Sequence, residues 1–104
     1  MRRFGQVARL KPEKIEEYKV LHAAVWPEVL KTIHRCNLRN YTIHLLDGQV
    51  FARFDYVGDD YEADMALMAA DPATQRWWTH TKPCFENHAI QEYYRDMEEI
   101  FFTE

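Results

Sequence analysis

The feature that most limits the fold is an Asp47-Gly48 pair set between two stretches with strand-like alternation. Before the pair, residues 41–45 alternate between an apolar and a polar face, and after it residues 49–57 alternate again. Side chains two residues apart lie on the same face of a β-strand, and Asp-Gly is a preferred two-residue hairpin turn. The sequence therefore predicts two antiparallel strands joined by this turn.

The remaining elements are predicted from helical periodicity, capping residues and prolines. Pro12 and Pro72 suit the first turn of a helix, and Asp71 can cap the helix that begins at Pro72. The predicted segments are a strand over 2–10, a helical segment over 12–36, the hairpin over 41–57, helices over 61–70 and 72–82, and a last strand over 97–103.

This order predicts a single α+β domain spanning residues 1–104, with a ferredoxin-like βαββαβ fold and helices on one face of an antiparallel sheet. The other face would then carry Val7, Phe51 and Val57, which are apolar. A second copy of the sheet could cover them. We therefore expect a homodimer.

A ridge of aromatic side chains distinguishes the first helical segment. Tyr18, His22 and Trp26 are four residues apart and therefore lie on the same face of a helix. Pro27 follows at once and cannot donate a backbone hydrogen bond, so we expect a kink or a short break there. The ridge predicts one wall of a ligand site.

Composition excludes several classes of partner. The 104 residues carry a formal net charge of −4, and Lys and Arg are scattered, which is unlike a nucleic-acid-binding surface. The apolar runs are too short for a membrane helix, and the N-terminus lacks the apolar core of a signal peptide. Cys36 and Cys84 are far apart. These features predict a soluble, cytoplasmic protein with free thiols.

His22 is the main candidate for acid–base chemistry. Imidazole gains and loses a proton near neutral pH, and the residues that share its helix face are mostly apolar. A histidine on an apolar helix face is, taken alone, more often a core residue bonded to a backbone carbonyl than a catalytic group. Tyr18, one turn earlier, favours a functional site because its hydroxyl can bind a ligand or position the imidazole.

Trp77-Trp78 and Tyr41 are candidate binding residues. Adjacent helical residues point about 100° apart, so one tryptophan is expected to pack in the core and the other to face a ligand. Tyr41 fits a core tyrosine whose hydroxyl reaches the pocket edge. Arg53 is expected in an ion pair or a subunit interface.

The histidines suggest no metal site. The five histidines and the carboxylates show no ligand spacing typical of metal proteins. We also find no glycine-rich phosphate loop. We therefore expect proton-transfer chemistry on a hydroxyl-rich small molecule, without a metal or cofactor.

Four motifs together resemble the L-rhamnose mutarotase family. They are E-E-Y-x-x-x-H-x-x-x-W-P-E at 16–28, N-Y-x-I at 40–43, Q-R-W-W at 75–78 and E-E-I-F at 98–101. The resemblance implies a dimeric α+β barrel that interconverts the α and β anomers of L-rhamnose. It also implies that His22 is the proton donor and that Tyr18, Tyr41, Trp77 and Trp78 bind the sugar.

In such a reaction the hemiacetal ring opens, the carbonyl rotates and the ring closes on its other face. His22 is expected to protonate the ring oxygen, while the base could be a tyrosine, a water or Glu28. The preferred sugar stays open between L-rhamnose, L-fucose and another aldose. Two other classes remain: a monooxygenase or haem-degrading enzyme of the same barrel type, and a non-catalytic ligand-binding domain.

Overall fold

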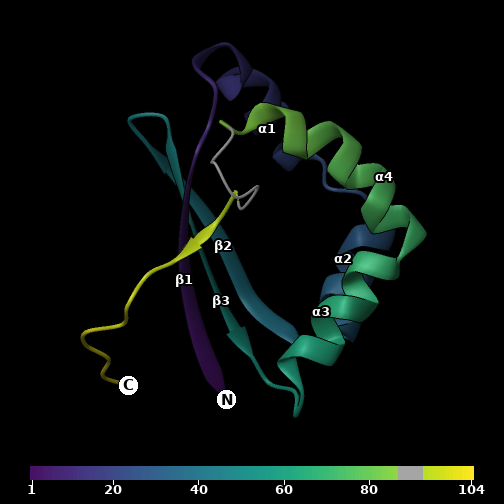
Figure 1. The fold of residues 1–104 in the computed structure, drawn as a ribbon, viewed down its shortest axis with the longest axis vertical. Coiled ribbons are helices and arrows are strands. Elements are labelled where there is room, and N and C mark those ends of the chain that lie inside the picture. The colour runs from purple at the N-terminus through teal and green to yellow at the C-terminus, as the bar shows by residue number, and fades with distance from the viewer. Residues whose placement is uncertain (87–92) are drawn as a thin grey trace.

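The computed structural model describes residues 1–86 and 93–104, and it has an antiparallel sheet with helices on one face (Figure 1). The sheet order is β2-β3-β1-β4, and the hydrogen-bonded neighbours are all antiparallel. The elements are β1 (Arg2–Arg9), η1 (Pro12–Lys14), α1 (Ile15–Ala23), α2 (Pro27–Arg35), β2 (Leu38–Leu46), β3 (Gln49–Tyr56), α3 (Tyr61–Ala70), α4 (Pro72–Thr81), η2 (Lys82–Cys84) and β4 (Arg95–Asp96). The predicted βαββαβ fold is confirmed.

The hairpin turn lies where the sequence predicts it. Leu46 pairs with Gln49 across the turn, and Asp47 and Gly48 have φ angles of 52° and 75°. Positive φ at both central residues is typical of the type I′ turn, whose twist matches that of the flanking strands. Local turn chemistry therefore sets the register of β2 against β3.

Pro27 divides the first helical segment into two helices. α1 ends at Ala23, and α2 begins at Pro27 with Trp26 before it in an extended conformation, at φ −62° and ψ 136°. A residue before proline is disfavoured in the helical region, because the proline ring crowds its backbone. The predicted break is confirmed, and Trp26 lies in the break rather than on the ridge with Tyr18 and His22.

The ends of the other helices also follow local signals. Asp60 accepts a hydrogen bond from the backbone N–H of Ala63 at 3.1 Å, and Asp71 accepts one from Thr74 at 2.9 Å. Both are N-cap bonds, which satisfy backbone donors that the first helical turn leaves free. Asn37 ends the α2 segment with a φ of 68°, a left-handed conformation that asparagine tolerates.

The prediction of a last strand over 97–103 is wrong. β4 is only Arg95–Asp96, paired with Gln6 and Val7 of β1. Beyond it, Met97 donates one backbone bond to the Gly5 carbonyl at 2.7 Å, and the rest of the segment has no regular structure. The apolar side chains that suggested a strand are exposed, so no burial holds them on the sheet: Ile100, Phe101 and Phe102.

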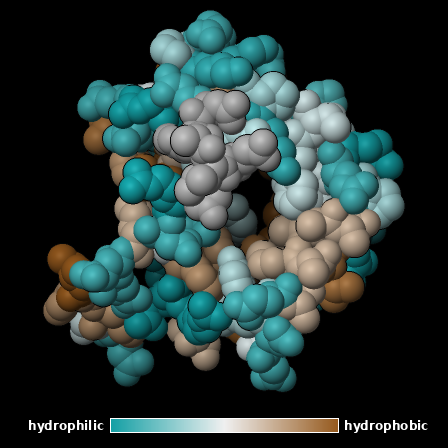
Figure 2. Space-filling view, in the orientation of Figure 1, coloured by the Kyte–Doolittle hydropathy of each residue, from teal (hydrophilic) through white to brown (hydrophobic). Residues whose placement is uncertain are grey.

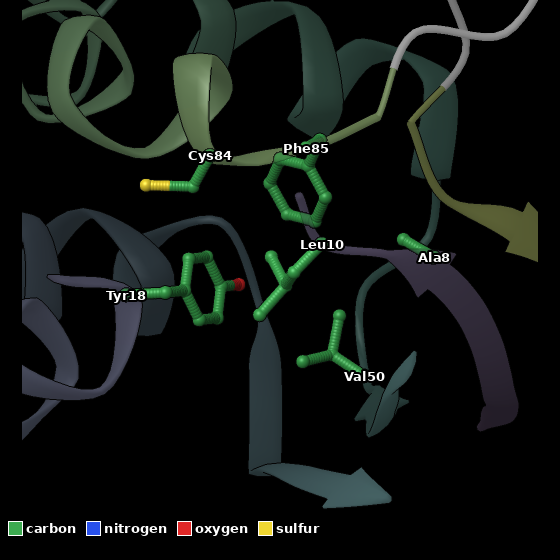
Figure 3. Close-up of a cluster of buried hydrophobic side chains, with 6 residues drawn as sticks. All are labelled: Ala8, Leu10, Tyr18, Val50, Cys84 and Phe85. Carbon is green, nitrogen blue, oxygen red and sulfur yellow. The ribbon is translucent and has the colours of Figure 1, made fainter. Parts of the chain in front are cut away.

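Two apolar clusters join the sheet to the helices. The first consists of Ala8, Leu10, Tyr18, Val50, Cys84 and Phe85, and Figure 3 shows Tyr18 reaching from α1 toward Leu10. The second contains Leu38, Phe54 and Tyr56, with side chains of α3 packed on it. Both clusters contribute to the walls of an internal cavity. Cys36 and Cys84 are buried free thiols.

His88, one of the five histidines of the sequence, lies outside the described residues. In the part of the chain that the structure describes, none of the helices combines the length and apolar character needed to cross a membrane.

Candidate functional site

Two adjoining cavities lie between the sheet and the helices, with volumes of about 280 and 370 Å³. The molecule is visibly hollowed between these two layers (Figure 2). Tyr18 lines the smaller cavity. The residues that line both cavities are His22, Tyr41, Ile43, Met68, Trp77 and Trp78. All five residues that the sequence suggested are thus gathered around one space, from α1, β2 and α4.

Two larger hollows lack the His22 imidazole among their described lining residues. A cavity of about 600 Å³ beside α4 and another of about 610 Å³ on the opposite face of the sheet include neither His22 nor Tyr41 among their described lining residues. A site is defined by the groups that can react or bind, and volume alone does not identify it. We therefore assign the candidate site to the two adjoining cavities.

The hydrogen bond at His22 defines its tautomer. Its Nδ1 lies 2.9 Å from the carbonyl oxygen of Tyr18. A carbonyl oxygen can only accept, so Nδ1 carries the hydrogen and Nε2 keeps its lone pair. Burial lowers the pKa of His22 from the usual 6.5, more than the bond to Tyr18 raises it. His22 is therefore neutral at pH 7, with Nε2 available to accept a proton.

Two aromatic rings hold the imidazole in this orientation. The Tyr18 ring centroid lies 4.2 Å from that of His22. The Trp77 ring centroid lies 5.5 Å from that of His22, in an edge-to-face arrangement. Such contacts restrict ring rotation, in addition to burying apolar surface. The alternative expectation, a histidine bonded to a backbone carbonyl, is correct for Nδ1. The ring nevertheless also lines the cavity.

Tyr18 is paired with a residue that the sequence did not suggest. The hydroxyl oxygens of Tyr18 and Tyr94 are 3.1 Å apart, and both residues line the smaller cavity. Desolvation raises the pKa of Tyr18 to about 12, against a smaller lowering by Tyr94. Residues 84–96 have no clear periodicity, and the only local signal for Tyr94 was its place in the Tyr93-Tyr94 pair.

The two tryptophans differ in burial but share the cavity walls. Trp77 is only 6% exposed and packs edge-to-face against Trp26, with ring centroids 5.2 Å apart. Trp78 is half-buried, and the Lys82 ammonium lies 4.4 Å from its ring centroid. The core tryptophan is therefore Trp77, yet it also lines both cavities.

Tyr41 lies across the space from α4. It is 38% exposed, its ring is 5.2 Å from that of Phe54, and desolvation raises the pKa of its hydroxyl. The expectation of a core tyrosine is therefore wrong, because Tyr41 is an exposed side chain, but it does line both cavities.

The other candidates lie outside the cavities. Glu28, the carboxylate considered as a base, is exposed in the first turn of α2 and is not among the described lining residues. Arg53 and Asp55 approach to 3.8 Å, as an ion pair. Among the described residues, no group of three or more His, Cys, Asp or Glu could hold a metal ion.

Comparison with known proteins identifies the family. The chain matches the L-rhamnose mutarotase family model over residues 3–103. It is 33% identical over 104 residues to the L-rhamnose mutarotase of Lactiplantibacillus plantarum and 29% identical over 102 residues to that of Oceanobacillus iheyensis, with 97% of each chain covered in both cases. The crystal structure of an L-rhamnose mutarotase from Formosa agariphila shares the fold, with a TM-score of 0.80, 20% identity and 100% of both chains covered. The chain belongs to the L-rhamnose mutarotase family.

Proposed function

We propose that this protein is an isomerase that interconverts the α and β anomers of L-rhamnose without a cofactor. Family membership supports the reaction. The observation that carries it is the His22 imidazole, which is bonded through Nδ1 to the Tyr18 carbonyl and lines a cavity enclosed by tyrosine and tryptophan rings. This arrangement favours mutarotation over the monooxygenase, haem-degrading and ligand-binding alternatives, because it supplies a proton acceptor beside surfaces suited to a sugar.

The tautomer of His22 suggests which proton moves first. The sequence led us to expect that His22 protonates the ring oxygen when the ring opens. The bond from Nδ1 to the Tyr18 carbonyl instead favours Nε2 as the acceptor of the anomeric hydroxyl proton. His22 then returns this proton to the same oxygen when the ring closes. General acid–base help of this kind is worth roughly 10²–10⁴-fold in rate.

The aromatic residues would hold the sugar. Trp77 and Trp78 present large apolar ring faces, which suit the C–H faces of a pyranose. Tyr18 and Tyr41 carry the hydroxyls that can hydrogen-bond its oxygens. These four residues line the cavities together with His22.

One-dimensional exchange NMR on a panel of aldoses tests the proposed function. The protein should accelerate the exchange between the anomers of L-rhamnose above the rate in buffer alone. L-Fucose tests another 6-deoxy sugar, and L-mannose tests the effect of a hydroxyl at carbon 6. Binding of L-rhamnose without acceleration would instead support a ligand-binding domain, and no effect on any aldose would reject the proposal.

The catalysed rate is expected to fall as the pH drops below 6.5. Burial lowers the pKa of His22 below its usual value of 6.5, and protonation below that pKa removes the Nε2 acceptor. The catalysed rate therefore decreases as the pH falls through the lowered pKa. Exchange rates measured from neutral to acidic pH, with sugar-only blanks subtracted, check this. A catalysed rate that rises over this range would mean that the imidazolium acts first.

The sheet face opposite the helices, called the open face from here on, supports a homodimer. In the part of the chain that the structure describes, all the helices lie on the other face (Figure 1), and the open face carries a cavity of about 610 Å³. Its lining includes Leu46, Phe51 and Phe102. Hydrophobic side chains also gather on the C-terminal segment (Figure 2). A second copy of the same face would remove these groups from water, as is usual for two-fold dimers.

Light scattering with a matched pair of variants tests the dimer. The wild-type protein should have twice the 12.5 kDa mass of the chain. Leu46→Glu, on the open face, should shift it toward monomer, because dimerisation would bury a carboxylate. Leu67→Glu, in α3 on the helical side, is the control, since the two leucines are 64% and 62% exposed. A monomeric wild type, or equal effects of the two substitutions, would contradict the dimer.

The predicted location in the cytoplasm also remains a proposal. The two buried cysteines are free thiols, which is usual in a reducing compartment. Fractionation of the native cells would test it.

A further inference from the structure

Ring opening needs an acid as well as a base, and His22 supplies only one of them. The anomeric oxygen and the ring oxygen are bonded to the same carbon, so the two groups that act on them must lie side by side. The nearest aromatic neighbour of His22 on the same helix is Tyr18, at 4.2 Å between ring centroids. Its hydroxyl is 3.1 Å from the hydroxyl of Tyr94.

We propose that Tyr18 is the acid that protonates the ring oxygen, and that Tyr94 is a positioning residue which donates a hydrogen bond to the Tyr18 oxygen. This inference rests on the proposed mutarotase function. The sequence left open which group acts together with His22, and the inference assigns Tyr18. It also gives a role to Tyr94, which lies 76 positions from Tyr18 in the chain.

The hydrogen-bonding capacity of the pair fits this division of roles. A phenol has one hydrogen to donate. In a bonded pair of phenols, one hydrogen is used between them and the other is free. If Tyr94 donates to Tyr18, the Tyr18 hydrogen is free for a ligand in the cavity. Burial raises the pKa of both hydroxyls, so both tyrosines are protonated at neutral pH and can donate.

The proton transfers balance. On opening, His22 Nε2 takes the proton of the anomeric hydroxyl, and the Tyr18 hydroxyl gives its proton to the ring oxygen. The bond from the anomeric carbon to the ring oxygen breaks, leaving an aldehyde and a new hydroxyl. Tyr18 is then a phenolate, which the hydrogen bond from Tyr94 stabilises, and His22 is an imidazolium. On closing, each proton returns to the group from which it came.

The fold holds Tyr94 in place from both sides. The next residues, Arg95–Asp96, form β4, and Asp96 pairs with Gln6 of β1. Their side chains are also bonded, with the Gln6 amide donating to the Asp96 carboxylate at 2.8 Å. The Tyr94 ring packs edge-to-face on Phe85, at 5.4 Å between centroids. The short β4 therefore brings a distant tyrosine to the α1 site.

A double-mutant cycle measured by anomer-exchange NMR tests the pair. Tyr18→Phe should lower the exchange rate of L-rhamnose by roughly 10²–10⁴-fold, as expected for loss of an acid. Tyr94→Phe should lower it by roughly 10–100-fold, the effect of one hydrogen bond to a charged group. The double variant should be no slower than Tyr18→Phe, because Tyr94 acts through Tyr18.

Sugar binding and a second tyrosine separate this role from a structural one. The sugar concentration at half-saturation should change little in Tyr94→Phe, while the maximal rate falls. Tyr56→Phe is the matched control, because its buried hydroxyl donates to Asp64 and lines none of the described cavities. It should lower the melting temperature and leave the exchange rate of the folded protein unchanged.

Each outcome decides the proposal. Wild-type exchange in Tyr94→Phe rejects the pair, and so does a double variant whose losses multiply, since Tyr94 would then act independently of Tyr18. A Tyr94→Phe protein that loses activity only because it melts at the assay temperature also rejects it. If the wild type itself shows no exchange on any aldose, the proposed function fails and this inference falls with it.

Discussion

His22→Ala is expected to remove nearly all of the catalysed anomer exchange while leaving the protein folded. Among the described residues, His22 carries the only imidazole that lines the two adjoining cavities of the site, and the substitution deletes it. The described hydrogen bond of its side chain runs to a carbonyl of its own helix, so the fold loses little. Loss of a general acid–base group costs roughly 10²–10⁴-fold in rate. Saturation-transfer NMR on L-rhamnose and circular dichroism measure the two parts of this prediction.

His34→Ala is the matched control for His22. His34 is an exposed histidine near the end of α2. Its removal should leave both exchange and folding unchanged. If His22→Ala exchanges the anomers as fast as the wild type, the assignment of His22 is wrong.

Trp77→Ala should cause the largest loss of stability, about 3–5 kcal/mol. Trp77 is buried and packs against both Trp26 and His22, with edge-to-face contacts at 5.2 and 5.5 Å. Truncation leaves a cavity where α4 meets the break between α1 and α2. Small domains are typically stable by only about 5–15 kcal/mol, so the variant should be close to unfolding. Denaturant titration followed by circular dichroism measures the change.

Trp78→Ala separates packing from sugar binding. Trp78 is half-buried, with Lys82 stacked on its ring, so its removal should cost much less stability than that of Trp77. Because Trp78 lines both cavities, sugar affinity should nevertheless fall. Equal losses of stability in the two variants would contradict the division between a core tryptophan and a more exposed one.

Local signals explain why much of the fold could be predicted. The Asp47-Gly48 turn, the caps at Asp60 and Asp71, and the break at Pro27 each depend on residues close in sequence. Turn and capping preferences act over a few residues and compete with little else. The same reasoning failed for the C-terminal segment. The alternation of side chains suggested a strand over 97–103, but the burial of that segment depends on what lies against it.

The candidate site was predictable only in part. Tyr18 and His22 could be found because they share a helix face, and Trp77-Trp78 because tryptophan pairs are uncommon. The sequence did not show that Trp77 contacts His22, nor that Glu28 is exposed outside the cavities. It also did not show which nitrogen of His22 carries the hydrogen, because the 2.9 Å bond to the Tyr18 carbonyl appears only once α1 is folded.

The sequence by itself determined the order of strands and helices, the hairpin register and the helix face that carries Tyr18 and His22. These depend on backbone preferences and on the period of side chains along one element. Only the tertiary structure decided that Tyr94 meets Tyr18, and that Trp77 lies against His22. Such contacts join residues far apart in the chain. They arise from packing across the sheet–helix interface, which no local pattern specifies.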